Sequence, residues 1–437
     1  MQSIRQVKRM SKNELQEKIQ TKPISRKERR ISIRSIVLDA FGVLVALQAL
    51  TVAALRVVAI MYRRKRKNDQ KPFPHQQSGL VSVGENVLQL YDYGCDLYDA
   101  MLVAIDAAQE SIYLETYIWK GDEVGQKFKD HLARKAAQGV EVYVIYDWFG
   151  NLVVPQAFKS FPPEIHHMAY HPIKHPWQIL DPRRYALDHR KILVVDGKIG
   201  FIGGFNLGSL YATEWRDTHL RIIGPTAADL ARSFVDFWNR SSPHGDTIDR
   251  RYQRQFDPLL ALRGNDAIRL TFPIRDMYIE AIDKAERSIM LTNAYFVPNH
   301  ILLEALKSAA QRGVDVRILV PWVSNHIDVD WVARGYFQEC LKAGIRIFGY
   351  RHMLHAKTCT IDGEWSTVGT ANLDRLSSIG NYEINVEIYS SEFALSMQKL
   401  FACDLTNAFE LTLNRWVGRP WYTKLSERIL APLRFMI

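Results

Sequence analysis

DHRKILVVDGKIGFIGGFN, residues 188–206, is the stretch that decides the fold of this chain. Ile192–Val195 is a run of β-branched and aliphatic residues, which is typical of a buried strand. Asp196-Gly197 is a strong signal for a two-residue hairpin turn with positive φ angles. Lys198–Ile202 is then predicted to be the returning strand of one β-hairpin.

A two-residue turn would place polar side chains together at the open end of this hairpin. Lys191 would lie opposite Ile202 in that register. His189 would lie opposite Gly204, and paired residues on neighbouring strands share a face. We therefore expect His189, Lys191 and Asn206 to converge. An imidazole, an ammonium and a carboxamide together can bind and attack a phosphate.

The same arrangement recurs in MLHAKTCTIDGEWSTVGTAN, residues 353–372. A single His-x-Lys is common and fits a surface strand with a solvated lysine. The second copy repeats every interval of the first with His355, Lys357, Asp362, Gly363 and Asn372, which indicates a site built from two copies. Asp196 and Asp362 fall at the turns, so their predicted role is to hold the hairpins and not to react with substrate.

The repeat extends far beyond the hairpins. AIDAAQESIYLETYIW (104–119) parallels AIDKAERSIMLTNAYF (281–296), and LARKAAQGVEVYVIYDW (132–148) parallels LKSAAQRGVDVRILVPW (306–322). Strands and helices alternate within each copy. The expected fold class is therefore α/β, with two pseudo-symmetric halves, each a mixed sheet flanked by helices, and the active site at their interface.

In the first copy, periodicity predicts a helix over 92–110, a strand over 111–119, a helix over 124–137 and a strand over 140–146. The halves are expected to span 85–245 and 267–410, joined by a connector over 246–266 that is rich in Arg, Gln, Asp, Pro and Gly. Residues 411–437 mix Trp, Tyr and Leu with Arg and Lys. This amphipathic segment either lies at a membrane interface or docks on the domain.

The net charge of +10 is unevenly distributed. Residues 1–71 contain 18 basic and 5 acidic side chains, a net of +13, and the remaining residues a net of −3. A nuclease usually surrounds its site with basic side chains, so this distribution disfavours nucleic acid as a partner. The four cysteines are scattered without a CxxC pair, which argues against a structural zinc site or a disulfide scaffold.

The N-terminal region predicts a membrane anchor. A basic tail over 1–35 precedes an apolar segment over 36–62, and Arg63–Lys67 opens a linker that extends to residue 84. The apolar segment is long enough to cross a hydrocarbon core of about 30 Å. The alternative is a buried or interfacial helix. Because both flanks are positive, the orientation stays open.

The segment between the second strand and the first motif contains His166, His167, His171 and His175. Four histidines raise the hypothesis of a metal site, but no Cys or carboxylate matches them at ligand spacing, so a loop near the mouth of the site is favoured. Arg183 and Arg184 precede the first motif and are candidate contacts for an anionic headgroup or ordinary surface arginines.

The paired His-x-Lys-x4-Asp-x6-Gly-x-x-Asn motifs resemble those of the phospholipase D superfamily. LETYIW, GVEVYVIYDW, WRDTHLRIIGP, AYFVP and GTANLDR are similar to bacterial cardiolipin synthases, and the resemblance covers about residues 85–437. One departure is Leu376-Ser-Ser378, where that family often has Arg-Ser-Phe. This difference bears on the choice of headgroup or acceptor.

The resemblance implies a set of catalytic residues, with His189 as the nucleophile that forms a phosphohistidine and His355 as the acid and base. The symmetry of the motifs does not itself decide between the two histidines. Asp217 and Glu383 match the carboxylates that orient the histidines. The full implied set is His189, Lys191, Asn206, Asp217, His355, Lys357, Asn372 and Glu383. No metal or other cofactor is expected, because the lysines can neutralise the phosphate.

These observations predict a cardiolipin synthase-type phosphatidyltransferase that moves a phosphatidyl group from phosphatidylglycerol to a second phospholipid. The expected partners are phospholipids and a membrane, the bacterial inner membrane by resemblance, and no nucleic acid; the oligomeric state is open. The alternatives are a membrane phospholipase D that hydrolyses lipids or uses another alcohol, a nuclease, and a lipid-binding scaffold without activity. The scaffold is disfavoured because both copies keep His, Lys and Asn.

Overall fold

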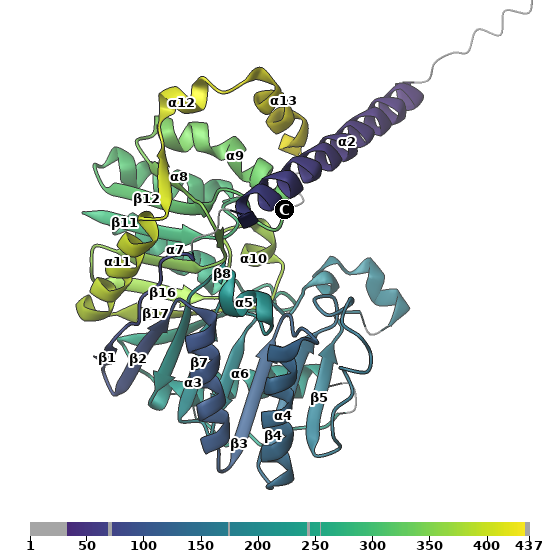
Figure 1. Ribbon diagram of the computed structural model, residues 1–437, viewed down its shortest axis with the longest axis vertical. Helices are drawn as coiled ribbons and strands as arrows, with labels where there is room; N and C mark the ends of the chain where they lie inside the picture. Colours follow the sequence, from purple (N-terminus) through teal and green to yellow (C-terminus); the bar gives the residue numbers. More distant parts are fainter. Residues whose placement is uncertain (1–32, 69–71, 174, 243–244, 254, 433–437) are drawn as a thin grey trace, which may run out of the picture. The chain divides into compact units, whose positions relative to one another are not determined.

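The computed structural model describes residues 33–68, 72–173, 175–242, 245–253 and 255–432 (Figure 1). The chain divides into two units, Met1–Ala49 and Leu50–Ile437. The second unit holds both eight-stranded β-sheets and a two-stranded one. The basic tail predicted over residues 1–35 lies almost wholly outside the described residues.

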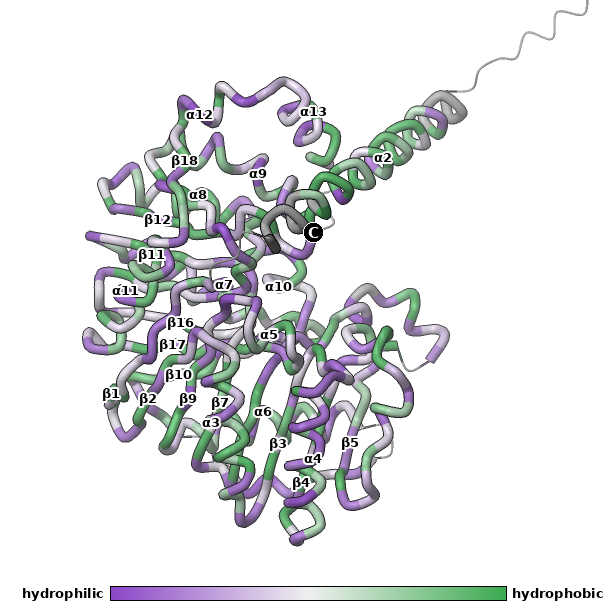
Figure 2. The backbone as a smooth tube through the Cα atoms, viewed as in Figure 1, coloured by the Kyte–Doolittle hydropathy of each residue, from purple (hydrophilic) through white to green (hydrophobic). Residues whose placement is uncertain are grey.

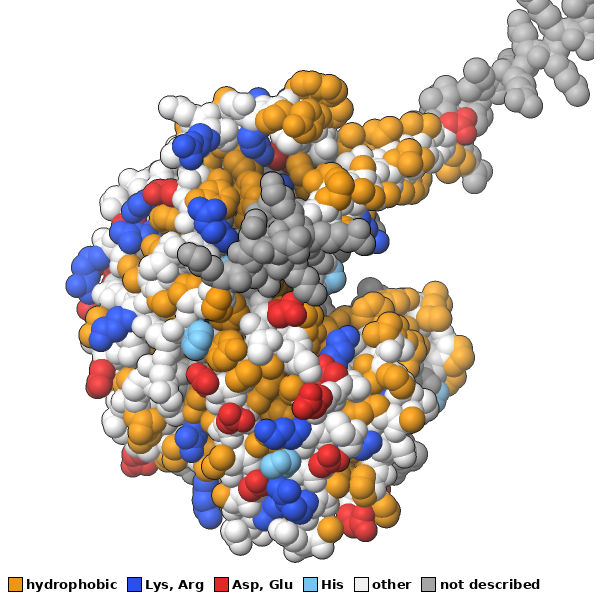
Figure 3. All heavy atoms as spheres, in the orientation of Figure 1, with side chains coloured by type: hydrophobic (Ala, Val, Ile, Leu, Met, Phe, Trp, Pro, Cys, Tyr) orange, Lys and Arg blue, Asp and Glu red, His pale blue; other side chains and the backbone are white. Residues whose placement is uncertain are grey.

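Helix α2 (Ile33–Asn68) includes the predicted membrane anchor and continues into the first residues of the predicted linker. Within it, Leu38–Val58 has a mean hydropathy of 2.1 over 21 residues and is almost entirely exposed. Most of its residues are hydrophobic by hydropathy (Figure 2), and hydrophobic side chains cover much of the face that Figure 3 shows. Among the described residues it is the one helix that is long and apolar enough to cross a membrane, judged by length and composition.

The first half is built on an eight-stranded sheet in the order β1-β2-β9-β7-β6-β3-β4-β5. Among its strand pairs only β3–β4 and β4–β5 are parallel, and β3 is antiparallel to β6 on its other side. Helix α4 begins where Asp122 accepts a hydrogen bond from the Gly125 N–H at 3.0 Å. The strands are β1 (Leu80–Val83), β2 (Asn86–Tyr91), β3 (Ser111–Thr116), β4 (Glu141–Asp147), β5 (Ile165–Tyr170), β6 (Ile192–Val195), β7 (Ile199–Gly203) and β9 (His219–Ile223). The helices are α3 (Gly94–Ala107), α4 (Glu123–Ala137), α5 (Ser209–Thr213) and α6 (Pro225–Ser241), with 3₁₀ turns η1 (Pro176–Leu180) and η2 (Pro182–Tyr185).

The second half repeats this plan in a sheet of order β10-β17-β16-β15-β11-β12-β13-β18. Its strands are β10 (Leu260–Asn265), β11 (Ser288–Asn293), β12 (Asp315–Pro321), β13 (Arg346–Tyr350), β15 (Lys357–Ile361), β16 (Trp365–Gly369), β17 (Glu383–Tyr389) and β18 (Ala408–Leu411). Its helices are α7 (Pro273–Asp283), α8 (His300–Gln311), α9 (Ile327–Lys342), α10 (Arg375–Ile379), α11 (Ser391–Leu405), α12 (Leu413–Val417) and α13 (Trp421–Leu430). The predicted α/β class with two similar halves is confirmed.

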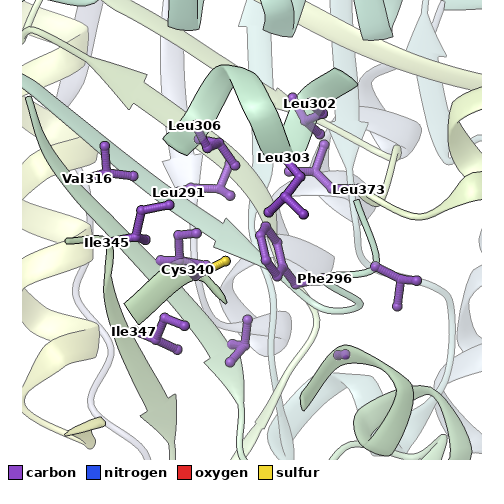
Figure 4. Packing of buried hydrophobic residues seen from close by; sticks show 14 of the residues in the cluster. Leu291, Phe296, Leu302, Leu303, Leu306, Val316, Cys340, Ile345, Ile347 and Leu373 are labelled. Atoms are coloured by element: carbon purple, nitrogen blue, oxygen red, sulfur yellow. The ribbon is translucent and has the colours of Figure 1, made fainter. Parts of the chain in front are cut away.

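Hydrophobic packing stabilises each half and also joins the two. In the second half, α8 and α9 cover β11–β13, where Leu306, Val316 and Cys340 are almost fully buried (Figure 4). A separate cluster contains Ile202 and Ile222 of the first sheet together with Val368 and Val386 of the second. Because each fully buried aliphatic side chain contributes about 1.5–3 kcal/mol, this shared cluster holds the sheets together.

Two short backbone pairings connect the halves beside the histidines. Strands β8 (Trp215–Arg216) and β14 (Met353–Leu354) form a parallel pair, and the His355 N–H donates to the carbonyl of Arg216 at 2.7 Å. An isolated bridge joins Asp188 to Tyr382, and the His189 N–H donates to the Tyr382 carbonyl at 3.1 Å. Each histidine backbone is therefore fixed by the other half.

The hairpin register differs by one residue from the prediction. Val195 pairs with Ile199 and Ile192 with Ile202, so Lys191 is not opposite Ile202. Asp196 and Gly197 do take positive φ angles of 53° and 63°, but the Lys198 N–H closes the turn on the Val195 carbonyl. Lys198 is consequently an extra residue between the paired strands, a bulge of the kind that follows a left-handed glycine. The second hairpin has the same register.

Three predicted boundaries also differ from the structure. Strand β1 lies inside the predicted linker, and β10 lies inside the predicted connector and pairs with β17. Arg263 and Gly264 make β10 resemble a connector in composition. Residue 411 ends β18, and the segment after it docks on α9 through Trp416 and Leu430, while Trp421, Tyr422 and Leu425 are exposed.

Candidate active site

The two motifs meet at the interface of the halves. His189 and Lys191 immediately precede β6, and Lys357 is the first residue of β15, two positions after His355. All four side chains are buried. The charges of Lys191 and Lys357 act on both histidines, which places the two motifs in one electrostatic cluster.

The histidine–carboxylate pairs cross between the halves. Nδ1 of His189 lies 2.9 Å and 3.0 Å from the two carboxylate oxygens of Glu383. Nδ1 of His355 lies 2.6 Å from Oδ2 of Asp217. Each pair thus joins a histidine of one half to a carboxylate of the other. When Nδ1–H donates to the carboxylate, Nε2 carries the lone pair that can attack phosphorus.

The two carboxylates differ in their electrostatics. Burial raises the pKa of Glu383 to about 8, although Lys191 and the hydroxyl of Thr370 oppose the rise. Burial would also raise the pKa of Asp217, but the charge of Lys357 and the contact with His355 outweigh it and lower that pKa to about 2. The Asp217 carboxylate is therefore the more firmly ionised of the two.

The lysines are held in the same way in both motifs. Nζ of Lys191 donates to the carbonyl of His189 at 2.6 Å, and Nζ of Lys357 donates to the carbonyl of His355. Burial and the repulsion of Lys357 together lower the pKa of Lys191 to about 7, against the opposing charge of Glu383. Burial also lowers the pKa of Lys357 to about 8. Two buried ammonium groups that repel each other favour a shared anion.

Both imidazoles are held neutral in this substrate-free site. Burial, followed by the charges of Lys191 and Lys357, places the pKa of His189 well below its usual range. Burial and Lys357 lower the pKa of His355 to about 3, against the opposing effect of Asp217. A phosphate between the lysines would cancel part of their charge and raise both pKa values.

Asn206 and Asn372 are both buried next to the motifs. Oδ1 of Asn206 accepts a hydrogen bond from the Ile118 N–H at 3.1 Å, and the Tyr98 hydroxyl donates to the Asn206 carbonyl at 2.5 Å. Oδ1 of Asn372 has no hydrogen-bond partner among the described residues.

Asp196 and Asp362 lie at the far ends of the hairpins from the histidines. The Asp196 carboxylate accepts hydrogen bonds from the N–H groups of residues 109–111, at 2.8–2.9 Å. The Asp362 carboxylate accepts from those of residues 286–288, at 2.7–2.8 Å. Each aspartate therefore ties its turn to the segment that enters the neighbouring strand.

Other predicted residues do not join this cluster in the contacts that the structure describes. Arg183 bonds to Asp181 at 2.8 Å, and Arg184 lies 4.0 Å from the same carboxylate. The predicted histidine-rich loop is partly a strand, since His166 and His167 belong to β5. In the described part of the chain, no group of three or more His, Cys, Asp or Glu side chains could hold a metal.

The sequence interpretation missed a buried ion network beneath the first motif. Arg190 pairs with Glu115 and lies 3.4 Å from Asp188, and its guanidinium stacks on the ring of Phe237 at 4.2 Å. The sequence did contain a signal for this network. Arg190 follows His189 directly, and successive side chains of an extended segment point to opposite faces, so Arg190 must point away from the site. A second buried pair joins Arg216 to Asp404 at 2.7 Å.

This geometry defines a class of enzyme. Two homologous α/β halves each supply a His-x-Lys motif and an asparagine to one buried site, with crossed histidine–carboxylate pairs. The chain is an enzyme of the phospholipase D superfamily.

Comparison with known proteins narrows the class. The family described as "Cardiolipin synthase, PLD-like domain" matches residues 101–238 and 278–405, and the chain belongs to this family. Cardiolipin synthase of Listeria monocytogenes is 32% identical over 375 residues, which cover 81% of this chain and 77% of that protein. Major cardiolipin synthase ClsA of Bacillus subtilis is 32% identical over 373 residues, which cover 81% of this chain and 76% of that protein. Phosphatidylserine synthase of Haemophilus influenzae shares the fold, with a TM-score of 0.63 and 13% identity. The match covers 86% of this chain and 97% of that protein.

Proposed function

We propose that the protein is a membrane-anchored cardiolipin synthase that transfers a phosphatidyl group from phosphatidylglycerol to the glycerol hydroxyl of a second phosphatidylglycerol. The observation that carries the proposal is the pair of crossed histidine–carboxylate contacts, at 2.9 Å and 2.6 Å, beside two buried lysines. The cardiolipin synthases of Listeria monocytogenes and Bacillus subtilis support the choice of lipid.

The first step forms a bond between Nε2 of His189 and phosphorus and breaks the bond from phosphorus to the glycerol oxygen. Lys191 and Lys357 neutralise the non-bridging oxygens, and the asparagines donate hydrogen bonds to them. His355, protonated once the phosphate is bound, gives its proton to the departing glycerol alkoxide. The products are free glycerol and a phosphatidyl-histidine.

The unequal carboxylates support this division of roles. An imidazolium is stabilised most by a carboxylate that stays ionised, and the pKa of Asp217 is lowered to about 2. His355, which contacts Asp217, is therefore the better proton donor. Glu383, with a pKa raised to about 8, stabilises a positive charge on His189 less, which favours the neutral nucleophile.

In the second step the acceptor hydroxyl attacks the phosphohistidine and its proton passes to His355. Because the phosphorus–nitrogen bond preserves the energy of the original ester, cardiolipin forms without another energy source. Water in place of the lipid hydroxyl would give phosphatidic acid. A phospholipase D that hydrolyses lipids or uses another alcohol is therefore the alternative, and Leu376-Ser-Ser378 is the departure from the family that keeps it open.

The proposed location is the bacterial inner membrane, with Leu38–Val58 as the anchor. The helix is long and apolar enough to span a bilayer, and the basic run Arg63–Lys67 next to it would be attracted to anionic lipid headgroups. Direct contacts of Arg183 and Arg184 with a headgroup stay a prediction.

The test gives the full-length protein phosphatidylglycerol liposomes and follows the lipids by mass spectrometry. We expect cardiolipin and glycerol from the wild type and neither from His189→Ala or His355→Ala. His300→Ala is the matched control, since His300 is exposed and should leave the yield unchanged. Phosphatidic acid without cardiolipin would favour hydrolysis, and activity in both histidine variants would disprove the site.

A further inference from the structure

The two motif asparagines are held by different means. In the first half, the Ile118 N–H donates to Oδ1 of Asn206 at 3.1 Å, which fixes the carboxamide and leaves its nitrogen to donate elsewhere. The Leu207 N–H donates to the Ile118 carbonyl at 3.0 Å. In the second half, Oδ1 of Asn372 is buried and has no partner among the described residues.

Asn293 explains the difference. It is the last residue of β11, pairs with Lys357 across the sheet and is fully buried. Its Oδ1 accepts hydrogen bonds from the N–H groups of Tyr295 at 3.1 Å and Leu373 at 3.2 Å. By the internal repeat, these N–H groups correspond to those of Ile118 and Leu207. One side-chain oxygen therefore replaces both acceptors of the first half.

This replacement leaves two complementary groups unpaired. The Tyr295 N–H is no longer available to Asn372, so Oδ1 of Asn372 lacks a donor. Nδ2 of Asn293 is buried and lacks an acceptor. Two backbone donors fix which end of the Asn293 carboxamide is oxygen, so its nitrogen is identified without ambiguity. The hydrogen bond from Leu373 places the donor beside Asn372.

We propose that Asn293 is the positioning residue for Asn372. When the phosphate of the substrate binds, Nδ2 of Asn293 donates to Oδ1 of Asn372, and this turns the amide nitrogen of Asn372 toward a non-bridging oxygen. The Ile118 N–H does the same for Asn206 in the other half. This inference rests on the proposed function, because it requires the site to bind a phosphodiester.

The corresponding residue of the first half supplies a matched control. Thr116 occupies the position equivalent to Asn293, and its hydroxyl donates to the Ile118 carbonyl at 3.2 Å. Thr116 does not contact Asn206 in the described hydrogen bonds, so Thr116→Val should keep kcat within about twofold of the wild type.

The decisive comparison is Asn293→Asp against Asn293→Thr. The aspartate keeps the oxygen that both N–H groups need but replaces the donor with an acceptor. We expect kcat to fall about 10- to 100-fold with KM within about twofold, less than the about 100- to 1000-fold cost of removing an oxyanion donor outright, because Asn372 itself remains. The threonine loses the hydrogen bonds from the Tyr295 and Leu373 N–H groups. It frees the Tyr295 N–H to donate to Asn372, as the Ile118 N–H donates to Asn206 in the first half, so kcat should stay within about threefold of the wild-type value.

A merely structural role predicts the opposite order, because Asn293→Asp preserves more hydrogen bonds than Asn293→Thr. Total loss of phosphatidylglycerol is measured, so that hydrolysis and transfer count equally. In an Asn372→Ala background, Asn293→Asp should have no further effect on kcat, whereas multiplied losses would overturn the proposal.

If Asn293→Asp does not fold, the test rests on Asn293→Thr, and a loss of tenfold or more in its kcat would overturn the proposal. A wild type that consumes no phosphatidylglycerol would instead refute the proposed function.

Discussion

His189 and His355 occupy equivalent positions in the two halves, in hairpins of the same register, and each contacts a carboxylate of the opposite half. Their supporting residues differ. Beneath the first motif, Arg190 is buried between Glu115 and Asp188. In the second half, Thr292 takes the position of Glu115, Ala356 that of Arg190 and Leu354 that of Asp188.

The second motif is supported by apolar packing. Leu354 and Ala356 are fully buried in a cluster with Leu319, Phe348 and Tyr350. One hairpin is thus held by an ion network and the other by a hydrophobic cluster, although the histidine and lysine of the two motifs are alike. The comparison teaches that the repeat preserved the side chains of the motifs, while the residues that support them and the pKa values of their carboxylates diverged.

The largest expected effect concerns which histidine attacks. A phosphatidyl ester of p-nitrophenol needs no proton for its leaving group, so His355→Ala should still release one equivalent of nitrophenol and accumulate a phosphohistidine. His189→Ala should lose at least about 10⁴-fold in rate and form no covalent lipid. Rapid quenching followed by mass spectrometry of the intact protein measures both. Accumulation in His189→Ala alone would reverse the assignment.

The next effect tests the support of the first motif. Arg190→Met leaves Glu115 and Asp188 buried without their counter-ion, and we expect a loss of about 3–5 kcal/mol in stability, measured by urea unfolding. Arg190→Lys keeps the charge but not the planar fork, so it should lose less.

A second variant tests whether the apolar residues of the second half can replace the ion network. The triple variant Glu115→Thr, Asp188→Leu, Arg190→Ala gives the first half the residues of the second. It should recover more than half of the stability that Arg190→Met loses, because no buried charge is left unpaired. A triple variant less stable than Arg190→Met would show that the network is not replaceable by apolar packing.

Much of this architecture could be predicted because it rests on local patterns. The alternation of β-branched residues around Asp196-Gly197 and the repeated intervals determine two hairpins in two α/β halves. The one-residue error in register arose because the Lys198 bulge depends on how the turn closes and on the anchoring of Asp196 by N–H groups of a distant segment. Such tertiary contacts leave no periodic signal.

The crossed pairs could not be predicted for a related reason. The intervals place one carboxylate after each asparagine, but only the packing of the two sheets decides that Glu383 reaches His189 and Asp217 reaches His355. The ion network of Arg190 depends equally on Glu115, which is distant in sequence. Sequence patterns identify the candidate reacting groups, and three-dimensional packing determines which residues contact them.

A smaller effect distinguishes the two carboxylates. The pKa of Asp217 is lowered from 3.8 to about 2, so its ionised form contributes about 2 kcal/mol to stability above pH 4. That contribution is lost as the pH falls through about 2, and roughly half of it by pH 3. The stability difference between wild type and Asp217→Asn, from urea midpoints, should therefore shrink between pH 6 and pH 3. A constant difference would contradict the lowered pKa.

The smallest effect is expected where the halves are alike. Asp196 and Asp362 both have φ angles above +50°, and each carboxylate accepts three backbone N–H groups. Asparagine tolerates this backbone conformation but offers one acceptor fewer, so Asp196→Asn and Asp362→Asn should each cost about 1 kcal/mol and leave kcat unchanged. Unequal losses in thermal unfolding would mean that the divergence between the halves extends from the supports of the histidines to the hairpin turns.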